Sequence, residues 1–189
     1  MSLWKYFGLE QAGKPAPGQR KAGAADTETV RKIVGALDQL DPARARFIAA
    51  FAYLLGRVAY ADQRISEEET RAMEQIVRER ASLPEEQAIL VVAIAKAQNL
   101  LFGGTENFLV SREFGKIAGR EEKIALLHGL YAVCSADRSI SVVEDNEIRN
   151  ISRELRLDHA DFIAVRMNYR DYLAVLKNPP APGNREAGL

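Results

Sequence analysis

The sequence predicts an all-α protein of about eight helices, and three observations support this fold class. From Asp26 onward, apolar residues recur at spacings of three and four, and capping signals and prolines separate the periodic stretches. No segment shows the sustained alternation and β-branched enrichment that strands require. A nine-residue motif occurs twice, 75 residues apart. We therefore expect two pseudo-symmetric helix-turn-helix repeats around one core.

The repeated motif reads Ala-Asp-x-x-Ile-Ser-x-x-Glu. It begins at Ala61 in the first copy and at Ala136 in the second, and the match continues at the same offset on both sides. A shared hydrophobic pattern alone would not reproduce Ala-Asp, Ile-Ser and Glu at fixed positions. Each copy is therefore expected to be the same unit, in which a helix, a tight turn opening on Asp and a second helix follow one another.

Start signals place the elements in chain order, with helices expected to begin at or near Asp26, Asp41, Ser66, Ser82, Thr105, Arg120, Ser141 and Asp158. Asp41-Pro42 combines a capping carboxylate with proline in the first turn. Ser66 and Ser141 each open an S-x-x-E capping box. Gly103-Gly104 is expected to end the helix that begins near Ser82. The last helix should run from Asp158 to about Leu176.

Length and composition limit the organisation of the chain. At 189 residues it should be one domain with tails, which we divide into a flexible arm over 1–25, a helical domain over 26–177 and a disordered tail over 178–189. The charge-free apolar stretches 47–55 and 88–95 should lie in the core. Zero net charge and the lack of a basic face argue against a nucleic-acid partner.

The expected location is the cytoplasm. The start of the chain lacks a long apolar core and a cleavage site, and no apolar run approaches the ~20 residues that would span a bilayer. Residues 3–9 carry aromatic side chains that could pack on the domain, dock on a partner or contact a membrane surface peripherally. The oligomeric state is left open.

The sequence offers little support for an enzyme. His128 and His159 lie in different segments, without a carboxylate or thiol at usable spacing. Cys134 is the only cysteine and lies in an apolar helical stretch, so a buried structural thiol is expected rather than a nucleophile. A non-enzymatic module that binds an unknown protein partner is therefore expected. Its C-terminal aromatic residues could line a groove or, alternatively, pack in the core: Phe162, Tyr169 and Tyr172.

The chain resembles the TerB-like family, helical domains named for a tellurite-resistance protein. The resemblance is carried by the two copies of the motif, 61–69 and 136–144, and by the ending at 157–177, which is similar to the single-domain bacterial branch. It covers roughly residues 26–177. It implies an all-helical domain, an acidic surface for a divalent metal or a protein partner, and an association with tellurite and other stress responses. The family's glycine after the aspartate is Gln63 in the first copy and Arg138 in the second.

The acidic residues of the two motifs are the candidate ligands of a divalent cation: Asp62, Glu68, Glu69, Asp137, Glu144 and Asp145. A conventional EF-hand is excluded, because the sixth and twelfth positions counted from Asp62 are Glu67 and Met73. The alternative is purely structural. Ser66 and Ser141 would cap helices, with Glu69 and Glu144 folding back onto them, and the aspartates would hold the preceding turns. Helix capping is the favoured interpretation, because too few oxygen ligands are evident.

Overall fold

The computed structural model describes residues 40–177, and within this range the chain is all-helical, as predicted. Its elements in chain order are α2 (Pro42–Ala59), α3 (Glu67–Ala81), α4 (Glu85–Ile117), α5 (Arg120–Cys134), α6 (Val142–Glu154), α7 (His159–Met167), the 3₁₀ helix η3 (Arg170–Tyr172) and α8 (Ala174–Lys177). The described part contains no strand, only an isolated parallel bridge between Ile140 and Leu173. The helix expected from Asp26, the arm over 1–25 and the tail over 178–189 lie outside the described residues.

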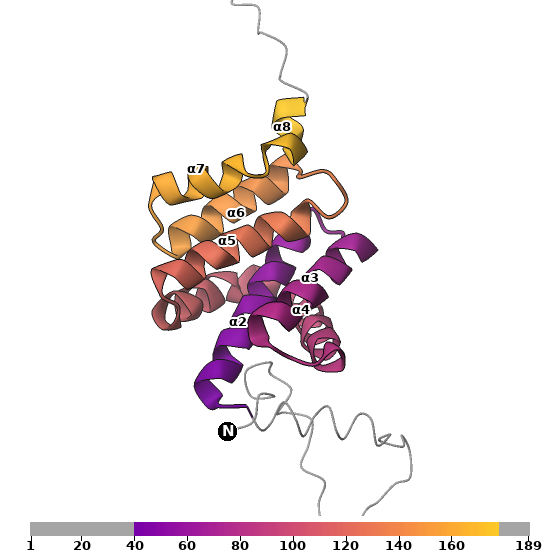
Figure 1. Cartoon of the computed structure of the whole chain (residues 1–189), viewed down its shortest axis with the longest axis vertical. Helices are drawn as coiled ribbons and strands as arrows, with labels where there is room; N and C mark the ends of the chain where they lie inside the picture. Colours follow the sequence, from indigo (N-terminus) through magenta and orange to yellow (C-terminus); the bar gives the residue numbers. More distant parts are fainter. Residues whose placement is uncertain (1–39, 178–189) are drawn as a thin grey trace, which may run out of the picture.

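Helix α2 runs through the middle of the fold, with α3 and the first half of α4 on one side and the layered helices α5, α6 and α7 on the other (Figure 1). The second half of α4 lies on the side of α5 and contacts α6 (Figure 1). From Ile48 to Ala59 every residue of α2 is buried, as its apolar sequence predicts. Leu54 and Leu55 from α2 and Leu126 and Leu130 from α5 are completely buried. Burial of such side chains contributes about 1.5–3 kcal/mol each, so the α2–α5 contact is a substantial part of the core.

The predicted start signals of α2, α3 and α6 are confirmed. The Asp41 carboxylate accepts hydrogen bonds from the backbone N–H groups of Ala43 and Arg44, with Pro42 at the first helical position. Ser66 and Ser141 form complete capping boxes with Glu69 and Glu144. These local bonds satisfy N–H groups that have no partner within the helix, so the two motif helices begin at equivalent residues.

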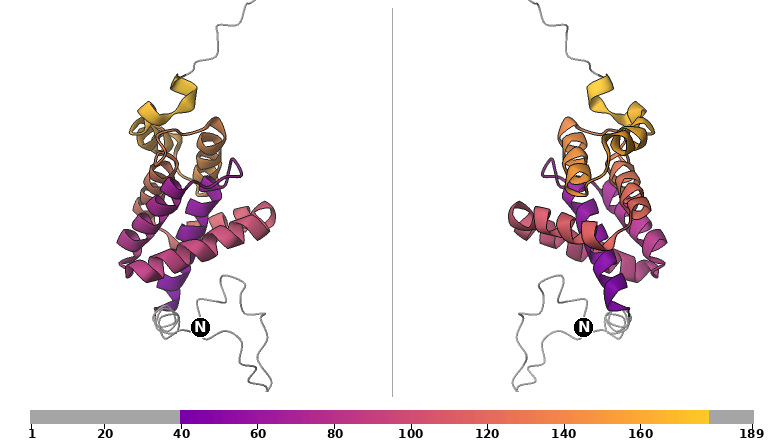
Figure 2. Two further views of the ribbon diagram at one scale, coloured as in Figure 1. Left: turned by 90° about the vertical axis from the view of Figure 1, so that its right-hand side faces the viewer. Right: turned by 90° about the vertical axis from the view of Figure 1, so that its left-hand side faces the viewer.

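The predicted break at Gly103-Gly104 is wrong, because α4 continues as one helix from Glu85 to Ile117. Thr105 therefore starts no separate helix. Glycine disfavours a helix by only about 1 kcal/mol per residue, and packing on α2 by both halves of α4 outweighs this cost. The ribbon changes direction midway, so that residues 85–101 and residues 105–117 point different ways (Figures 1 and 2). Small residues such as a glycine pair are a common site of sharp helix kinks, and Gly103-Gly104 lies where the direction changes.

Two further expectations about helix ends are wrong. Ser82 does not open α4. It ends α3 in a left-handed conformation with φ 48°, and α4 begins after Pro84. The last helix does not run unbroken to Leu176, because α7 ends at Met167. The chain is instead held against the second repeat by two backbone bonds of Ile140: its N–H donates to Tyr172 O, and its carbonyl accepts from Ala174 N.

The two repeats share unusual backbone geometry. The non-glycine residues with positive φ in the described part fall into two pairs, Gln63 with Arg138 and Ser82 with Arg156. The first pair lies in the motif turns, with φ values of 67° and 70°. The second pair lies where α3 and α6 end, but it is out of register by one residue: Ser82 is the C-cap of α3, whereas Arg156 follows Leu155, the C-cap of α6. The equivalence of the backbone is therefore exact at the motif turns and shifts by one residue at the ends of the helices that follow.

Arg57 on α2 links the two repeats through a buried ion-pair network. Its side chain is 6% exposed, and its guanidinium donates to Glu147 and Glu154 on α6 and to Ser111 on α4. These hydrogen bonds and ion pairs compensate the positive charge of Arg57 for its removal from water. The network fixes α2, α4 and α6 relative to one another.

Candidate functional site

The two motif glutamates project from their capping boxes toward the interior. Glu69 accepts hydrogen bonds from the Ser66 backbone N–H and hydroxyl at 2.7 and 2.8 Å, both on Oε2. Glu144 accepts the Ser141 N–H at 2.7 Å, again on Oε2. The other carboxylate oxygen, Oε1, takes no part in either capping box. Both residues are only 5% exposed.

The motif aspartates hold the turns before the capping boxes. Asp62 Oδ1 accepts from the Arg64 backbone N–H at 3.0 Å, and Asp137 Oδ1 accepts from the Ser139 N–H at 2.9 Å. Both aspartates are exposed. The predicted bonds from side chain to backbone in these turns are confirmed, and the turns keep positive φ without the family's glycine.

The fold brings the two copies of the motif together. Glu69, Glu144 and Cys134 each offer one atom to a cluster in which these atoms lie within 4.8 Å of one another. The three side chains come from α3, α6 and the end of α5. Two carboxylates at equivalent positions, 75 residues apart in the chain, are thus neighbours in the buried centre.

The environment of the pair disfavours its negative charge. Burial raises the pKa of Glu69 to about 7, and the charges of Glu144 and Asp137 add to the shift, while the bonds from Ser66 oppose it. Burial likewise raises the pKa of Glu144, with a further contribution from the charge of Asp62. Each glutamate therefore feels the aspartate of the other repeat. Such like-charge crowding in a buried position is typical of functional sites.

Cys134 is the member of the cluster that the sequence analysis did not connect with the acidic motifs. It is 1% exposed, which confirms the predicted burial. Burial, together with the charge and hydrogen bond of Glu144, raises the pKa of its thiol well above the usual value. The thiol is therefore protonated at neutral pH and is a poor nucleophile. The sequence does place Cys134 close to the second motif, because Cys134 ends the helix that immediately precedes that motif.

Four of the six candidate ligands lie outside this cluster, and two of them, Asp145 and Glu68, are directed elsewhere. The Asp145 carboxylate is engaged by the Arg166 guanidinium, with distances of 2.8 to 3.1 Å, and by the Tyr131 hydroxyl at 2.8 Å. Glu68 is exposed on the outer side of α3. The geometry thus reduces the six candidates to Glu69 and Glu144, with Asp62 and Asp137 as nearby charges.

The donor set of the cluster fits a small divalent cation. Magnesium-type ions are held in proteins by one or two carboxylates and keep several waters. Glu69 and Glu144 each retain an oxygen outside the capping box, as noted above. The thiol of Cys134 adds a softer donor that zinc accepts. The residues present therefore fit a cation bound through two carboxylates. Magnesium would use the carboxylates alone, whereas zinc could also bind the sulfur of Cys134.

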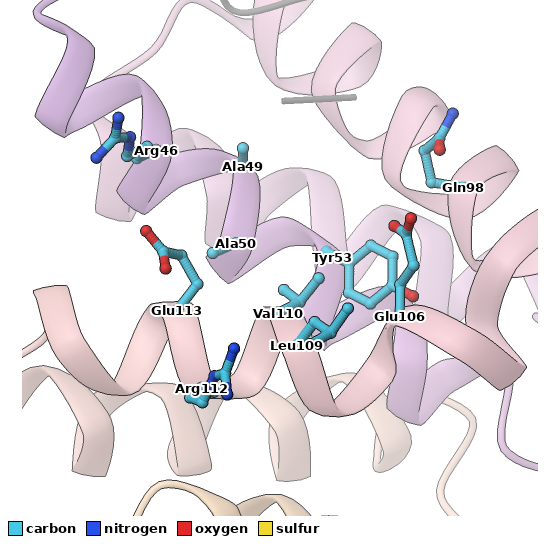
Figure 3. Close-up of a pocket in the computed structure, with 10 residues that line it drawn as sticks. All are labelled: Arg46, Ala49, Ala50, Tyr53, Gln98, Glu106, Leu109, Val110, Arg112 and Glu113. Carbon is cyan, nitrogen blue, oxygen red and sulfur yellow. The ribbon is translucent and has the colours of Figure 1, made fainter. Parts of the chain in front are cut away.

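A separate hollow of about 360 Å³ lies between α2 and α4. Figure 3 shows α2 and the second half of α4 facing each other across it, with Gln98 on the first half of α4 at one end. Its floor is apolar, with Ala49, Ala50 and Val110. Its charged lining residues carry both signs: Arg46, Glu106, Arg112 and Glu113.

An apolar patch lies beside the first motif turn. Leu100 and Leu101 on α4 are 64% and 67% exposed, the highest values for large apolar side chains in the described part. They line a hollow of about 370 Å³ together with Gln63 from the turn and Val143 from α6. Gln63 belongs to the first motif and Val143 to the second, so the patch takes a residue from each repeat.

Within residues 40–177, both histidines pack against aromatic rings rather than against catalytic partners. His128 packs against the ring of Tyr169, and its backbone carbonyl accepts the Tyr169 hydroxyl at 3.0 Å. His159 is exposed in the first turn of α7 and stacks against Phe162. Phe162 itself is buried, so the core-packing alternative holds for this residue. Among the described residues, no helix has the length and apolar character needed to cross a membrane.

Fold and site together define an all-helical protein of two repeats that meet at a buried carboxylate pair. The comparison with protein families agrees: the model described as "Tellurite resistance protein TerB" matches residues 47–167, which is more than half of the chain. The protein therefore belongs to the TerB family. Searches of curated proteins and of solved structures returned no match.

Proposed function

We propose that this TerB-family domain is a non-enzymatic binding module that takes a divalent cation between its two repeats. The observation that carries the proposal is the convergence of Glu69 and Glu144, which lie with Cys134 in one cluster of potential ligand atoms. The two carboxylates would be the ligands, and Asp62 and Asp137 would add negative charge from the turns. The bound cation would contribute charge neutralisation at a place where two acids are buried together.

Helix capping alone does not account for this pair. A capping box accepts glutamine as well as glutamate, and glutamine would make the same backbone contact without a buried charge. The protein instead carries two acids whose pKa values are both raised. A cation that binds the ionised carboxylates would neutralise the two buried negative charges, so that their burial would no longer be unfavourable. The capping and metal interpretations are therefore compatible, because the box uses only Oε2 of each residue.

Thermal unfolding of chelator-treated protein tests the proposal, with magnesium, calcium, manganese or zinc added singly. A cation at about 100 times its Kd adds about 2.7 kcal/mol to the free energy of unfolding, which raises Tm by several degrees. We expect such a shift at pH 8, where the carboxylates are ionised, and a smaller shift at pH 6. Unchanged Tm with all four metals at pH 8 would contradict the proposal.

Matched variants locate the binding residues. Glu69→Gln and Glu144→Gln should abolish the shift while keeping the capping boxes. Glu68→Gln, one residue away and exposed, should retain it. Cys134→Ser separates the metals: loss of a zinc shift with an unchanged magnesium or manganese shift assigns the sulfur as a ligand of zinc only.

A protein-binding role is the second candidate, favoured by the exposed apolar patch of Leu100, Leu101 and Val143. Contiguous exposed apolar surface often marks an interaction site. The first partner to test is a second copy of the chain. Sedimentation should then show a concentration-dependent dimer that Leu101→Asp abolishes. An association with tellurite or stress responses rests on the family description and stays a proposal.

A further inference from the structure

The hollow between α2 and the second half of α4 combines an apolar floor with charged ends. Ala49, Ala50 and Val110 form the floor, and Leu109 lines the hollow while 51% of its surface remains exposed. A cavity of ~150 Å³ already holds a molecule the size of benzene. The volume of about 360 Å³ therefore leaves room for apolar side chains of a binding partner.

The charged side chains are distributed unequally along this hollow. Glu106 lies at one end, beside Tyr53 (Figure 3). Burial and the charge of Glu106 raise the pKa of Tyr53 to about 12, so the carboxylate acts on this end of the hollow. Arg46, Arg112 and Glu113 lie towards the other end (Figure 3).

The second end is cationic in spite of Glu113. The carboxylate of Glu113 lies 3.6 Å from the Lys116 ammonium, one turn further along α4. Arg46 and Arg112 add two positive charges at the same end. Both Glu106 and Arg112 are exposed, so a partner that covers the hollow meets a negative charge at one end and positive charge at the other.

The spacing of these residues makes the surface complementary to itself. Glu106 lies three residues before Leu109, and Arg112 lies three residues after it. Positions three apart are neighbours on a helix surface, so Leu109 lies between the two charges. When two copies of α4 pack antiparallel about Leu109, the negative end of each copy meets the positive end of the other. A two-fold axis produces this relationship, because it makes both contacts identical.

We propose that two copies of this chain associate through the hollow between α2 and α4, around a two-fold axis at Leu109. Glu106 of each copy pairs with Arg112 of the partner subunit, and Leu109 of each copy covers the apolar floor of the other. The proposal goes beyond the cation site, because Glu69 and Glu144 lie on α3 and α6 and take no part in this contact.

The apolar patch of Leu100, Leu101 and Val143 offers a second copy no equivalent arrangement of charges. Among the described residues, the charged groups that line its hollow are Arg57 and Glu147. These two are already paired with each other at 2.6 Å. Charge complementarity therefore favours the hollow between α2 and α4 as the surface that a second copy covers.

Sedimentation equilibrium of the full-length chain, from about 1 μM to about 1 mM, tests the dimer. Arg112→Glu and Glu106→Arg should each raise the Kd at least about tenfold, since each places like charges at both contacts. An equimolar mixture of the two variants should dimerise with a Kd close to that of the wild type, because both contacts of a mixed pair again join opposite charges. A mixture that stays monomeric would overturn the proposal, as would monomeric wild-type protein at about 1 mM.

A matched pair of variants locates the contact on α4. Phe108 and Leu109 are similarly exposed neighbours, at 56% and 51%, but only Leu109 lines the hollow. Leu109→Asp should abolish the dimer, and Phe108→Asp should retain it. A dimer that is lost with Leu101→Asp but retained with Leu109→Asp would overturn the proposal in favour of the apolar patch. Glu69→Gln with Glu144→Gln should dimerise like the wild type, so the metal-induced Tm shift and the dimer fail or succeed separately.

Discussion

Glu69 and Glu144 occupy the same position in the two repeats, and their carboxylates approach within 4.8 Å in the buried centre of the fold. Each also completes the capping box of its own helix. Each glutamate thus caps its own helix, as the sequence predicts. The contact between the two glutamates, in contrast, exists only because the fold brings the repeats together. Burial raises the pKa of both groups, the charge of Glu144 adds to the shift of Glu69, and the charge of Asp62 adds to that of Glu144. The buried centre is therefore unfavourable for negative charge on either residue.

Removing the charge of Glu69 should stabilise the metal-free protein. Glu69→Gln keeps an acceptor for the Ser66 N–H and eliminates the repulsion by Glu144 and Asp137. At pH 8 we expect the free energy of unfolding to rise by roughly 1–3 kcal/mol, measured by urea denaturation with chelator present. A loss of about 1 kcal/mol would instead indicate that the carboxylate serves the cap alone.

The pH dependence of stability should carry the signature of Glu69. Its folded-state pKa of about 7 lies above the ordinary value of 4.5, so the folded state binds more protons than the unfolded state between these values. Stability contributed by the protonated group is therefore lost as pH rises from about 4.5 to about 7. We expect this decrease in wild-type protein relative to Glu69→Gln, followed by denaturant titration at several pH values. Parallel pH profiles for the two proteins would contradict the raised pKa.

Restoring the family's glycine should relax the motif turns. Gln63 and Arg138 hold φ values of 67° and 70°, a conformation that is unfavourable for residues with a side chain. Gln63→Gly and Arg138→Gly should each raise the free energy of unfolding by about 0.5–1 kcal/mol, as judged by chemical denaturation. Gln63→Ala serves as the control and should give no gain, since alanine has the same steric conflict. A gain in the alanine variant would point to the side chain rather than to the backbone.

Loss of Arg57 should destabilise the contact between the repeats. Arg57→Met removes the bonds to Glu147, Glu154 and Ser111 and leaves two carboxylates without their partner. The expected cost is about 3 kcal/mol in the free energy of unfolding. The comparison is Arg71→Met, whose exposed pair with Glu67 should change stability by less than about 1 kcal/mol. Equal effects in the two variants would show that the Arg57 network is no stronger than a surface pair.

Much of the fold was predictable because its signals are local. Capping at Asp41, Ser66 and Ser141 depends on residues within three or four positions, and each was confirmed. The all-helical class and the family followed from periodicity and from the repeated motif. Helix ends were less predictable. Gly103-Gly104 did not end α4, because packing on α2 outweighs the weak preference of glycine against helices.

The sequence by itself determined the helical class, the starts of α2, α3 and α6, the capping boxes, the motif turns and the presence of two equivalent units, since these depend on neighbouring residues. Only the tertiary structure decided which acidic residues meet. It brought Glu69 and Glu144 together with Cys134, directed Asp145 to Arg166, and left Glu68 in solvent. It also selected Arg57 as the buried link to α6. The physical reason is that proximity between residues on different helices is set by helix packing, which no local pattern encodes.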